Sequence, residues 1–540
     1  GNGHAMLRGA CNMHKEVNMA KYLLKRILYG AMSIAIVVAI IMIMVYSLLD
    51  REKIFRNDPV YQKNSNNSKI TYMYQKWEEY GYLDYVTYEE YLNALVKAGE
   101  LDEETRKEAA SLGKTPEKDS EITAEYVAEF KAYYEARGYE VIRLDVVNIG
   151  RKVASGGQQR LFASKDIPLI NRLFGYFAGL LSFDNIHEVE GDVGERGLSF
   201  TLYDPAYGGD KFSPAIMGNG TQHKYLLYCD DSFPFIHQNL VTINLGTSYS
   251  VNQGIDVFAT MTLSQGSYVR SMVSYPTGLK ENSADDLHSA TYVAGSREMS
   301  QLNMDRFADD YTNVSTIKAG KSRMGYSFII GIVSTFLSYL IGIPLGILMA
   351  RKKDKLIDKL GMVYIVFMIA VPSLAYIFLF KAIGGKMGLP TTFDMETTSR
   401  LIYVLPIVSL MLPSVANLMK WLRRYMVDQM NADYVKFARS GGLSEGEIFR
   451  KHILKNAAIP IVHGIPGAVL FAMTGAFITE RVYVVPGTGK LLIEAINMYD
   501  NGVIVGVAFF YAVLTVVSII LGDVLMALVD PRISFTTRDR

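Results

Sequence analysis

Apolar segments long enough to cross a lipid bilayer recur along this sequence, and they restrict the possible folds more than any other feature. Lipid cannot hydrogen-bond the backbone, so an isolated segment that crosses it must be helical. About 20 apolar residues in a helix span the roughly 30 Å of hydrocarbon. We therefore predict an α-helical polytopic membrane protein with six transmembrane helices, at Ile27–Leu49, Tyr326–Ala350, Leu360–Ile383, Leu401–Leu422, Ile461–Ile478 and Gly502–Leu528.

Basic residues at the ends of these segments predict which side of the membrane each loop occupies. Lys25 and Arg26 precede the first span, Arg351–Lys355 follows the second, and Arg423 and Arg424 close the fourth. Loops on the cytoplasmic side carry an excess of Lys and Arg. Both termini are therefore predicted in the cytoplasm of a cell whose plasma membrane the chain crosses, with residues 50–322 on the outside.

Residues 50–322, between the first two spans, are numerous enough to fold as a domain with its own core. Residues 61–137 contain helix-like patterns, whereas residues 140–320 contain short β-rich runs separated by glycine, asparagine and proline. We predict an extracellular α+β domain inserted between the first and second helices. The other predicted divisions are an N-terminal extension or tag at 1–20, a cytoplasmic N-terminus with the first span at 21–49, and the remaining spans at 323–540.

Motifs for catalysis and nucleotide binding are incomplete. Leu112–Thr115 resembles the end of a phosphate-binding loop without its first glycine, and Gly487–Lys490 lacks the terminal Ser or Thr. His223 and His237 lack the spacing of metal ligands. The formal net charge is +1 and the basic residues lie beside apolar segments, which disfavours nucleic-acid binding. We therefore predict no enzyme, cofactor or metal site in this chain, and any ATP and Mg²⁺ on other subunits.

The polar loop 428–458, between the fourth and fifth spans, is the most informative stretch. Tyr434, Phe437 and Ala438 can share one face of a helix, Gly441-Gly442 should end that helix, and Ser444 can cap a second one with Glu447 at the capping-box position. Two short helices around a glycine turn would form a stiff protrusion for docking a cytoplasmic partner. An amphipathic loop lying on the lipid headgroups fits the same pattern.

A family resemblance favours the docking protrusion. The pattern A-R-x-x-G-L-S-E, followed by a basic helix and N-A-x-I-P, resembles the cytoplasmic coupling loop of ATP-binding-cassette importer permeases, in the oligopeptide/dipeptide (OppB/DppB) branch. Thr479–Leu492 resembles an external loop of the same branch, and Gly522-Asp523 with Asp530–Arg532 resembles its C-terminus. The large insertion is similar to that of the AmiC kind. The implied ATPase-coupling residues are Tyr434, Phe437, Ala438, Arg439, Gly442, Leu443, Ser444 and Glu445, and the external loop motif is Glu480, Pro486, Gly487 and Gly489.

The resemblance implies a type I importer permease fold and a set of partners. These are a homologous second permease subunit (OppC type), two ATPase subunits (OppD/OppF type) that bind ATP and Mg²⁺, and a lipid-anchored extracellular peptide-binding protein (OppA type). The implied substrate is an oligopeptide. The alternative is a mechanotransmission or signalling subunit, in which an ATPase drives the outer domain and nothing crosses. Aromatic residues of the outer domain suit either its core or a docking surface: Tyr225, Tyr228, Phe233 and Phe235.

Overall fold

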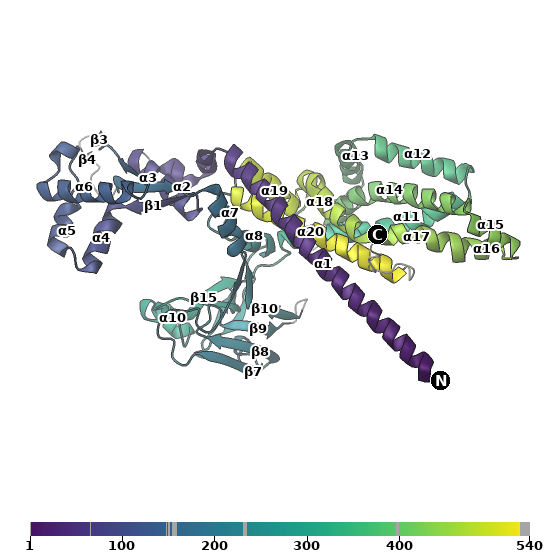
Figure 1. Ribbon diagram of the computed structural model, residues 1–540, viewed down its shortest axis with the longest axis horizontal. Helices are drawn as coiled ribbons and strands as arrows, with labels where there is room; N and C mark the ends of the chain where they lie inside the picture. The colour runs from purple at the N-terminus through teal and green to yellow at the C-terminus, as the bar shows by residue number, and fades with distance from the viewer. Residues whose placement is uncertain are drawn as a thin grey trace.

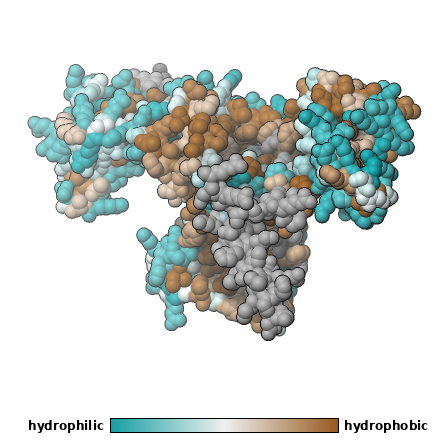
Figure 2. All heavy atoms as spheres, turned by 45° about the vertical axis from the view of Figure 1, so that its right-hand side comes forward, coloured by the Kyte–Doolittle hydropathy of each residue, from teal (hydrophilic) through white to brown (hydrophobic). Residues whose placement is uncertain are grey.

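The computed structural model describes residues 2–529 apart from residues 65, 147, 150–151, 154–158, 231–234 and 396–398. A helical bundle forms one end of the molecule, and two lobes built from residues 51–316 lie toward the other end (Figure 1). Figure 2 shows hydrophobic surface gathered over the middle of the molecule, between hydrophilic ends. This distribution is typical of a protein that crosses a membrane.

Within the described residues, five helical stretches are long and apolar enough to cross a membrane, by length and composition. Two more helices, α12 and α13, pass the same test only as a pair. The helices of the bundle are α1 (Asn2–Leu48, apolar from Tyr22), α11 (Arg323–Arg351), α12 (Leu356–Ala370), α13 (Ser373–Lys386), η4 (Arg400–Tyr403) with α14 (Val404–Met430), α18 (Ile465–Tyr483), α19 (Thr488–Asn497) and α20 (Asn501–Val529).

The predicted span Leu360–Ile383 is wrong as a single helix. Helices α12 and α13 meet at an angle of 109° around Val371 and Pro372. Proline has no N–H to donate, and it pushes the residue before it out of the helical region, so the helix ends at Ala370. The fifth span is also divided, because α17 (Lys455–His463) and α18 are separate helices on either side of Gly464.

Helix α11 packs along α14 and α18, and small residues let it approach closely. Gly342 and Gly346 of α11 lie against Leu418 and Leu422 of α14. Close approach of this kind strengthens van der Waals packing, which is a main force between helices in lipid. A bidentate pair also joins α12 to α14, where the Arg423 guanidinium donates to both Asp358 oxygens at 2.6 Å.

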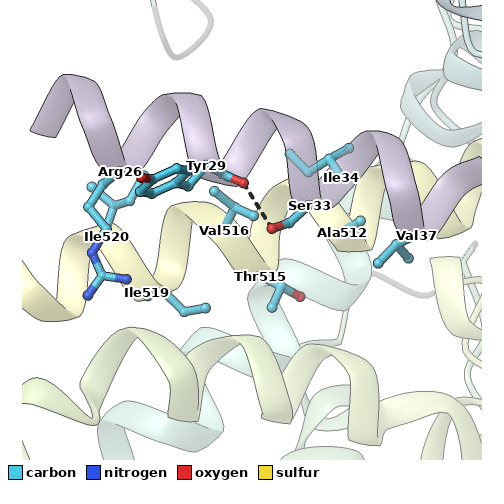
Figure 3. Close-up of a pocket in the computed structure, with 11 residues that line it drawn as sticks. Arg26, Tyr29, Ser33, Ile34, Val37, Ala512, Thr515, Val516, Ile519 and Ile520 are labelled. Atoms are coloured by element: carbon cyan, nitrogen blue, oxygen red, sulfur yellow. Dashed lines mark hydrogen bonds between the residues drawn. The ribbon is translucent and has the colours of Figure 1, made fainter.

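Helix α1 packs along α20. An apolar groove of about 350 Å³ remains between them, with Tyr29 and Ser33 on one side and Val516 on the other (Figure 3). At one end of this groove Arg26 lies 2.9 Å from the carboxylate of Asp523. The two helices therefore share a charged end and an otherwise apolar interface.

The first lobe combines helices with a three-stranded antiparallel sheet of order β1-β5-β2. The predicted division between a helical part (61–137) and a β-rich part (140–320) is therefore misplaced, because β5 pairs with β1 from the helical part and β2 from the other. Its elements are η1 (Arg51–Asn57), α2 (Pro59–Lys63), α3 (Asn66–Glu79), β1 (Leu83–Thr87), α4 (Tyr88–Ala98), α5 (Glu103–Ala109), η2 (Pro116–Lys118), α6 (Glu121–Glu135), β2 (Glu140–Arg143), β3 (Asn148–Ile149), β4 (Lys152–Val153) and β5 (Leu161–Asp166).

The second lobe is built around a four-stranded antiparallel sheet of order β10-β9-β8-β7. Its elements are β7 (Gly197–Tyr203), η3 (Pro205–Tyr207), β8 (Phe212–Asn219), β9 (Tyr225–Cys229), β10 (Ile236–Gln238), β12 (Ser271–Ser274), β13 (Lys280–Ser283), β14 (Asp285–Tyr292), α9 (Ser296–Met299), α10 (Gln301–Arg306) and β15 (Tyr311–Thr316). The connecting elements are α7 (Leu169–Ala178), β6 (Leu181–Phe183), β11 (Val241–Ile243) and α8 (Val257–Thr262).

A buried carboxylate fixes the lobes to the bundle. Asp500, between α19 and α20, is fully buried and accepts hydrogen bonds from the Ser248 hydroxyl (2.6 Å) and from the backbone N–H groups of Tyr249, Ser250 and Val251 (2.9 Å each). The first turn of α20 contributes a further hydrogen bond, from the N–H of Val503 at 3.1 Å. Apolar residues around Leu245 and Val257 pack beside this site against α19 and α20. The domain formed by the two lobes, called the outer domain after its predicted position, is thus joined to the two C-terminal helices as well as to its neighbours in sequence.

A part-buried ion pair is expected to make the first lobe sensitive to acid. Arg143 donates to both oxygens of Asp119, at 2.6 and 2.8 Å, and these hydrogen bonds lower the pKa of Asp119 below its ordinary value of 3.8. A carboxylate with a lowered pKa stabilises the fold above its unfolded pKa, and that contribution disappears as the pH falls through the folded pKa. We expect the lobe to unfold more readily below about pH 4, and Asp119→Asn to weaken this acid dependence. Hydrogen exchange of residues 113–143 from pH 3 to 7 measures the loss of stability. Identical pH profiles for the unaltered protein and Asp119→Asn would contradict the role of this ion pair.

Candidate functional site: the coupling element and the external loop

Residues 433–448, called the coupling element after their predicted role, lie at the end of the bundle opposite the two lobes (Figure 1). It consists of α15 (Asp433–Ser440), a turn at Gly441-Gly442, and α16 (Glu445–Ile448), which continues into η5 (Phe449–Leu454, with π-helical hydrogen bonding) and α17. The predicted glycine break and capping box are confirmed: Gly442 has φ +80°, and Ser444 and Glu447 exchange their capping hydrogen bonds. The local pattern of residues was sufficient to predict both features.

The inner face of the coupling element is buried against the helical bundle. Val435 of α15 and Ile448 of α16 are buried in one apolar cluster with Leu422 and Met426 of α14 and Ala350 of α11. A displacement of α15 or α16 must therefore move the ends of α11 and α14, because closely packed interiors transmit strain.

The outer face carries a large exposed aromatic side chain. Phe437 is 75% exposed, and it does not share one helix face with Tyr434 and Ala438 as predicted. Tyr434 instead lies against the bundle, with its hydroxyl 2.6 Å from the Gln429 side-chain oxygen, and Ala438 packs on the buried cluster. Helix α15 is too short to bury both faces, so Val435 takes the inner position and Phe437 points outward. An exposed phenylalanine on a protruding helix is typical of a protein-docking site.

An ion pair closes the turn between the two short helices. The Arg439 guanidinium donates to both oxygens of Glu445, at 2.5 and 3.1 Å, and lowers the pKa of that carboxyl group. Leu443 is half-buried, and its N–H donates to the Ala438 carbonyl at 3.2 Å. Contacts among the residues of the A-R-x-x-G-L-S-E pattern thus stabilise a compact helix–turn–helix, in which the backbone at Gly442 is left-handed.

Gly442→Ala should destabilise the turn of this helix–turn–helix. A side chain at Gly442 would meet no atom within 4 Å, so the change acts through the left-handed backbone alone. That conformation costs a residue other than glycine about 1–2 kcal/mol, which corresponds to roughly five- to thirtyfold faster amide exchange across residues 441–445. Gly446→Ala is the matched control, because Gly446 is helical and has equally open surroundings. Equal exchange rates in the two variants would show that the left-handed turn is unimportant.

The external loop motif surrounds a second buried carboxylate. Glu480, near the end of α18, is fully buried; it accepts hydrogen bonds from the Ser327 hydroxyl of α11 (2.6 Å) and from the Lys490 N–H of α19 (2.9 Å). The Thr488 N–H in turn donates to the Ser327 oxygen at 2.9 Å. Glu480 therefore ties α11, α18 and the start of α19 together.

The glycines of this motif are required by that carboxylate. A Cβ at Gly487 would lie 2.3 Å from the Glu480 carboxyl group, and a Cβ at Gly489 would lie 2.0 Å from the ring of Phe477. Between them and α18, Val484 has φ +61° and Pro486 is buried, so the chain reverses direction within a few residues. The four residues singled out in the sequence lie together, and their contacts give them a structural role in positioning α19.

A groove of about 620 Å³ opens among α11, α12, α13, α14, α17 and α18. Its lining mixes apolar residues with the polar side chains of Thr335, Ser414 and Asn417, and with the stacked rings of Trp421 and Tyr425. Sequence reasoning did not predict this groove, nor the Asp358–Arg423 pair or the Asp500 site, because each is assembled from distant segments. Charged residues inside or beside apolar runs were the available signal for the last two.

Other predicted residues have plainer environments. Tyr225 is buried against Asp204 and His288 in the second lobe, Phe235 is exposed, and Phe233 and Asp530–Arg532 lie outside the described residues. His223 is paired with Asp184 at 3.0 Å. The described part of the chain contains no group of three or more metal-ligating side chains.

The apolar helices and the domain matched in sequence define the class of this protein. Residues 342–535 match the family described as "binding-protein-dependent transport system inner membrane component". Together with the helices above, this match defines a polytopic helical permease of the ATP-binding-cassette class.

The particular family follows from relatives in sequence. The chain is 34% identical over 536 residues to the oligopeptide transport system permease protein AmiC of Streptococcus pneumoniae serotype 4, covering 96% of this chain and 99% of AmiC. It is 31% identical over 210 residues to the dipeptide transport system permease protein DppB of Bacillus subtilis, covering 38% of this chain and 67% of that protein. The chain therefore belongs to the oligopeptide/dipeptide permease family.

Among solved structures, an amino acid ABC transporter matches 39% of this chain and 92% of its own, with 15% identity and a TM-score of 0.31. The MetNI methionine ABC transporter in an inward-facing conformation matches 38% of this chain and 93% of its own, with 15% identity and a TM-score of 0.32.

Proposed function

We propose that this chain is the transmembrane permease subunit of an ATP-driven oligopeptide importer. In this proposal α12 and α13 together make the third of six crossings, both termini are cytoplasmic, and residues 50–322 are extracellular. The basic residues at Arg351–Lys355 and Arg423–Arg424 support this orientation, because they lie at the same end of the bundle as the coupling element. The relatives named above are permeases of peptide transport systems.

The observation that carries the proposal is the two-sided coupling element. Its outer face offers Phe437 to a partner, while its inner face is packed among α11 and α14 through Val435 and Ile448. A cytoplasmic ATPase that grips the outer face could thereby shift the bundle. Such a shift requires the ATPase to hold the element differently in its two nucleotide states, since equal binding to both would change nothing.

The proposed peptide path uses the 620 Å³ groove, completed by a second, homologous permease subunit. A peptide presents backbone amides and varied side chains, and the groove offers both polar groups and aromatic rings. The outer domain, joined to α19 and α20 through Asp500, would receive a lipid-anchored peptide-binding protein and seal the outer entrance. ATP and Mg²⁺ belong to two ATPase subunits in this scheme.

Reconstitution tests the proposal. The chain is assembled in liposomes with a second permease, two ATPases and a peptide-binding protein from the same organism, and uptake of a labelled oligopeptide is measured with and without ATP. We expect uptake that needs ATP, the binding protein and this chain. ATP hydrolysis stimulated by the assembly without any peptide uptake would instead indicate a mechanotransmission subunit. Failure of the chain to associate with any ATPase would reject both.

A further inference from the structure

Helix α7 joins the two lobes of the outer domain, and it packs directly on membrane-spanning helices. Leu173, Tyr176 and Phe177 on one face of α7 share an apolar cluster with Val38 and Met42 of α1 and with Val505 and Phe509 of α20. These contacts belong to the body of both long apolar helices rather than to the loops beyond them.

The depth of this contact can be measured along α20. The Arg26–Asp523 pair marks the charged end of α1 and α20. Val505 precedes Asp523 by about 27 Å of helix, whereas the hydrocarbon layer is roughly 30 Å thick. Helix α7 therefore lies at the boundary between hydrocarbon and headgroups, on the side of the outer domain.

The face of α7 beside these contacts is apolar and uncovered. Ile170 and Phe174 lie next to the contact residues around the helix and are 57% and 67% exposed. Polar contacts lie on a third side, where the Arg172 guanidinium stacks on the rings of Tyr46 and Tyr82 at 3.9 and 4.0 Å. Tyrosine rings of this kind concentrate at membrane interfaces. Such a helix, with one side held by protein and one side bare, resembles an interfacial helix.

The strands that follow α7 extend the same apolar surface. In the β6–β11 ribbon, Leu181 pairs with Ile243 and Phe183 pairs with Val241, while Ser182 pairs with Thr242. Side chains alternate across a strand, so the first two pairs share one face and the polar pair occupies the other. Leu181, Phe183 and Ile243 are 36–63% exposed. Figure 1 shows this narrow connection running from α7 and α8 to the β7–β10 sheet.

We infer that α7 and the apolar face of the β6–β11 ribbon insert into the lipid leaflet on the side of the outer domain. The contact surface consists of Ile170, Phe174, Leu181, Phe183 and Ile243. It adjoins α1, on which α7 packs and whose Ile40 and Met44 are also exposed. A bilayer already surrounds α1, so lipid is the occupant that this continuity favours. The outer domain is then held against the membrane beside the transport path.

Depth-dependent fluorescence quenching tests the inference in the full-length chain. Cys11 and Cys229 are replaced by serine, and an environment-sensitive fluorophore is attached after Ile170→Cys, Phe174→Cys or Phe183→Cys. The proteins are reconstituted in phosphatidylcholine vesicles with and without brominated acyl chains. Met299→Cys is the control, because Met299 is 82% exposed and lies in α9, on a different part of the second lobe.

We expect the labels at positions 170, 174 and 183 to be quenched several-fold more by brominated lipid than the label at position 299, and to fluoresce at shorter wavelength. Iodide in water should quench position 299 preferentially. Equal iodide quenching at all positions with none by brominated lipid would overturn the inference. Protection from iodide only after the other subunits are added would also overturn it, by assigning the surface to a protein interface. The measurement needs neither ATP nor peptide, so its result is independent of the proposed transport.

Discussion

Phe437→Ala is expected to weaken binding of the cytoplasmic ATPase by about 30- to 1,000-fold, a loss of roughly 2–4 kcal/mol typical of an aromatic hot spot. The reason is geometric: the side chain is 75% exposed on a short helix whose other face is buried, so its burial can come only from a partner. Binding of the purified ATPase to the permease in detergent or nanodiscs measures the effect. Peptide uptake should fall in parallel.

Because Phe437 is exposed, its replacement should change ATPase binding without changing the stability of the fold. Removing a side chain that is three-quarters exposed should leave the thermal stability of the permease nearly unchanged. Lys436→Ala is the matched control, since Lys436 is the exposed neighbour and pairs with the exposed Asp433 at 2.8 Å. Exposed pairs of this kind contribute about 1 kcal/mol or less. If Phe437→Ala binds the ATPase as tightly as the unaltered protein, the docking role of this face is wrong.

Asp500→Ala is expected to release the outer domain from α19 and α20. The variant loses five hydrogen bonds to a fully buried carboxylate and leaves the N–H groups of Tyr249, Ser250 and Val251 without an acceptor. Each buried donor left unsatisfied costs about 1–3 kcal/mol, so a total loss of about 3 kcal/mol or more is expected. Amides 248–251 should then exchange about a hundredfold faster.

Hydrogen exchange of the full-length protein, followed by peptide mapping, measures this change. Asp192→Ala is the control, because Asp192 is exposed and accepts a local hydrogen bond from the Gly194 N–H at 3.1 Å. Unchanged protection of residues 248–251 after Asp500→Ala would mean that the apolar contacts around Leu245 hold the junction alone. Under the proposed function, a loosened junction should also reduce uptake, since movements of α19 and α20 would no longer reach the outer domain.

The two buried carboxylates, Glu480 and Asp500, connect different elements at the end of the bundle nearest the lobes. Glu480 joins α18 to α11 and α19, and Asp500 joins the next loop to the outer domain. The chain from α18 to α20 is therefore a continuous, hydrogen-bonded unit between the bundle and the lobes. The coupling element lies at the opposite end, packed against α11 and α14. Helix α11 touches both regions, so it is the element through which a movement at one end can reach the other.

Local patterns predicted much of this arrangement. The long apolar runs, the glycine break at Gly441-Gly442 and the capping box of Ser444 and Glu447 all depend on residues close together in sequence. The sharp bend at Pro372 was not predicted, although the proline itself was visible, because a proline can kink a helix slightly or end it. Which of the two occurs depends on what the neighbouring helices accept.

The sequence by itself determined that this chain is a helical membrane protein with a large inserted domain and a polar helix–turn–helix, because hydropathy and turn chemistry are local properties. Only the tertiary structure decided that Val435 faces the bundle while Phe437 faces outward, that Glu480 and Asp500 become buried acceptors, and that α7 lies against α1 and α20. Those outcomes depend on contacts between segments tens to hundreds of residues apart, such as Ser248 with Asp500, and the periodicity of a single segment carries no information about its distant partner.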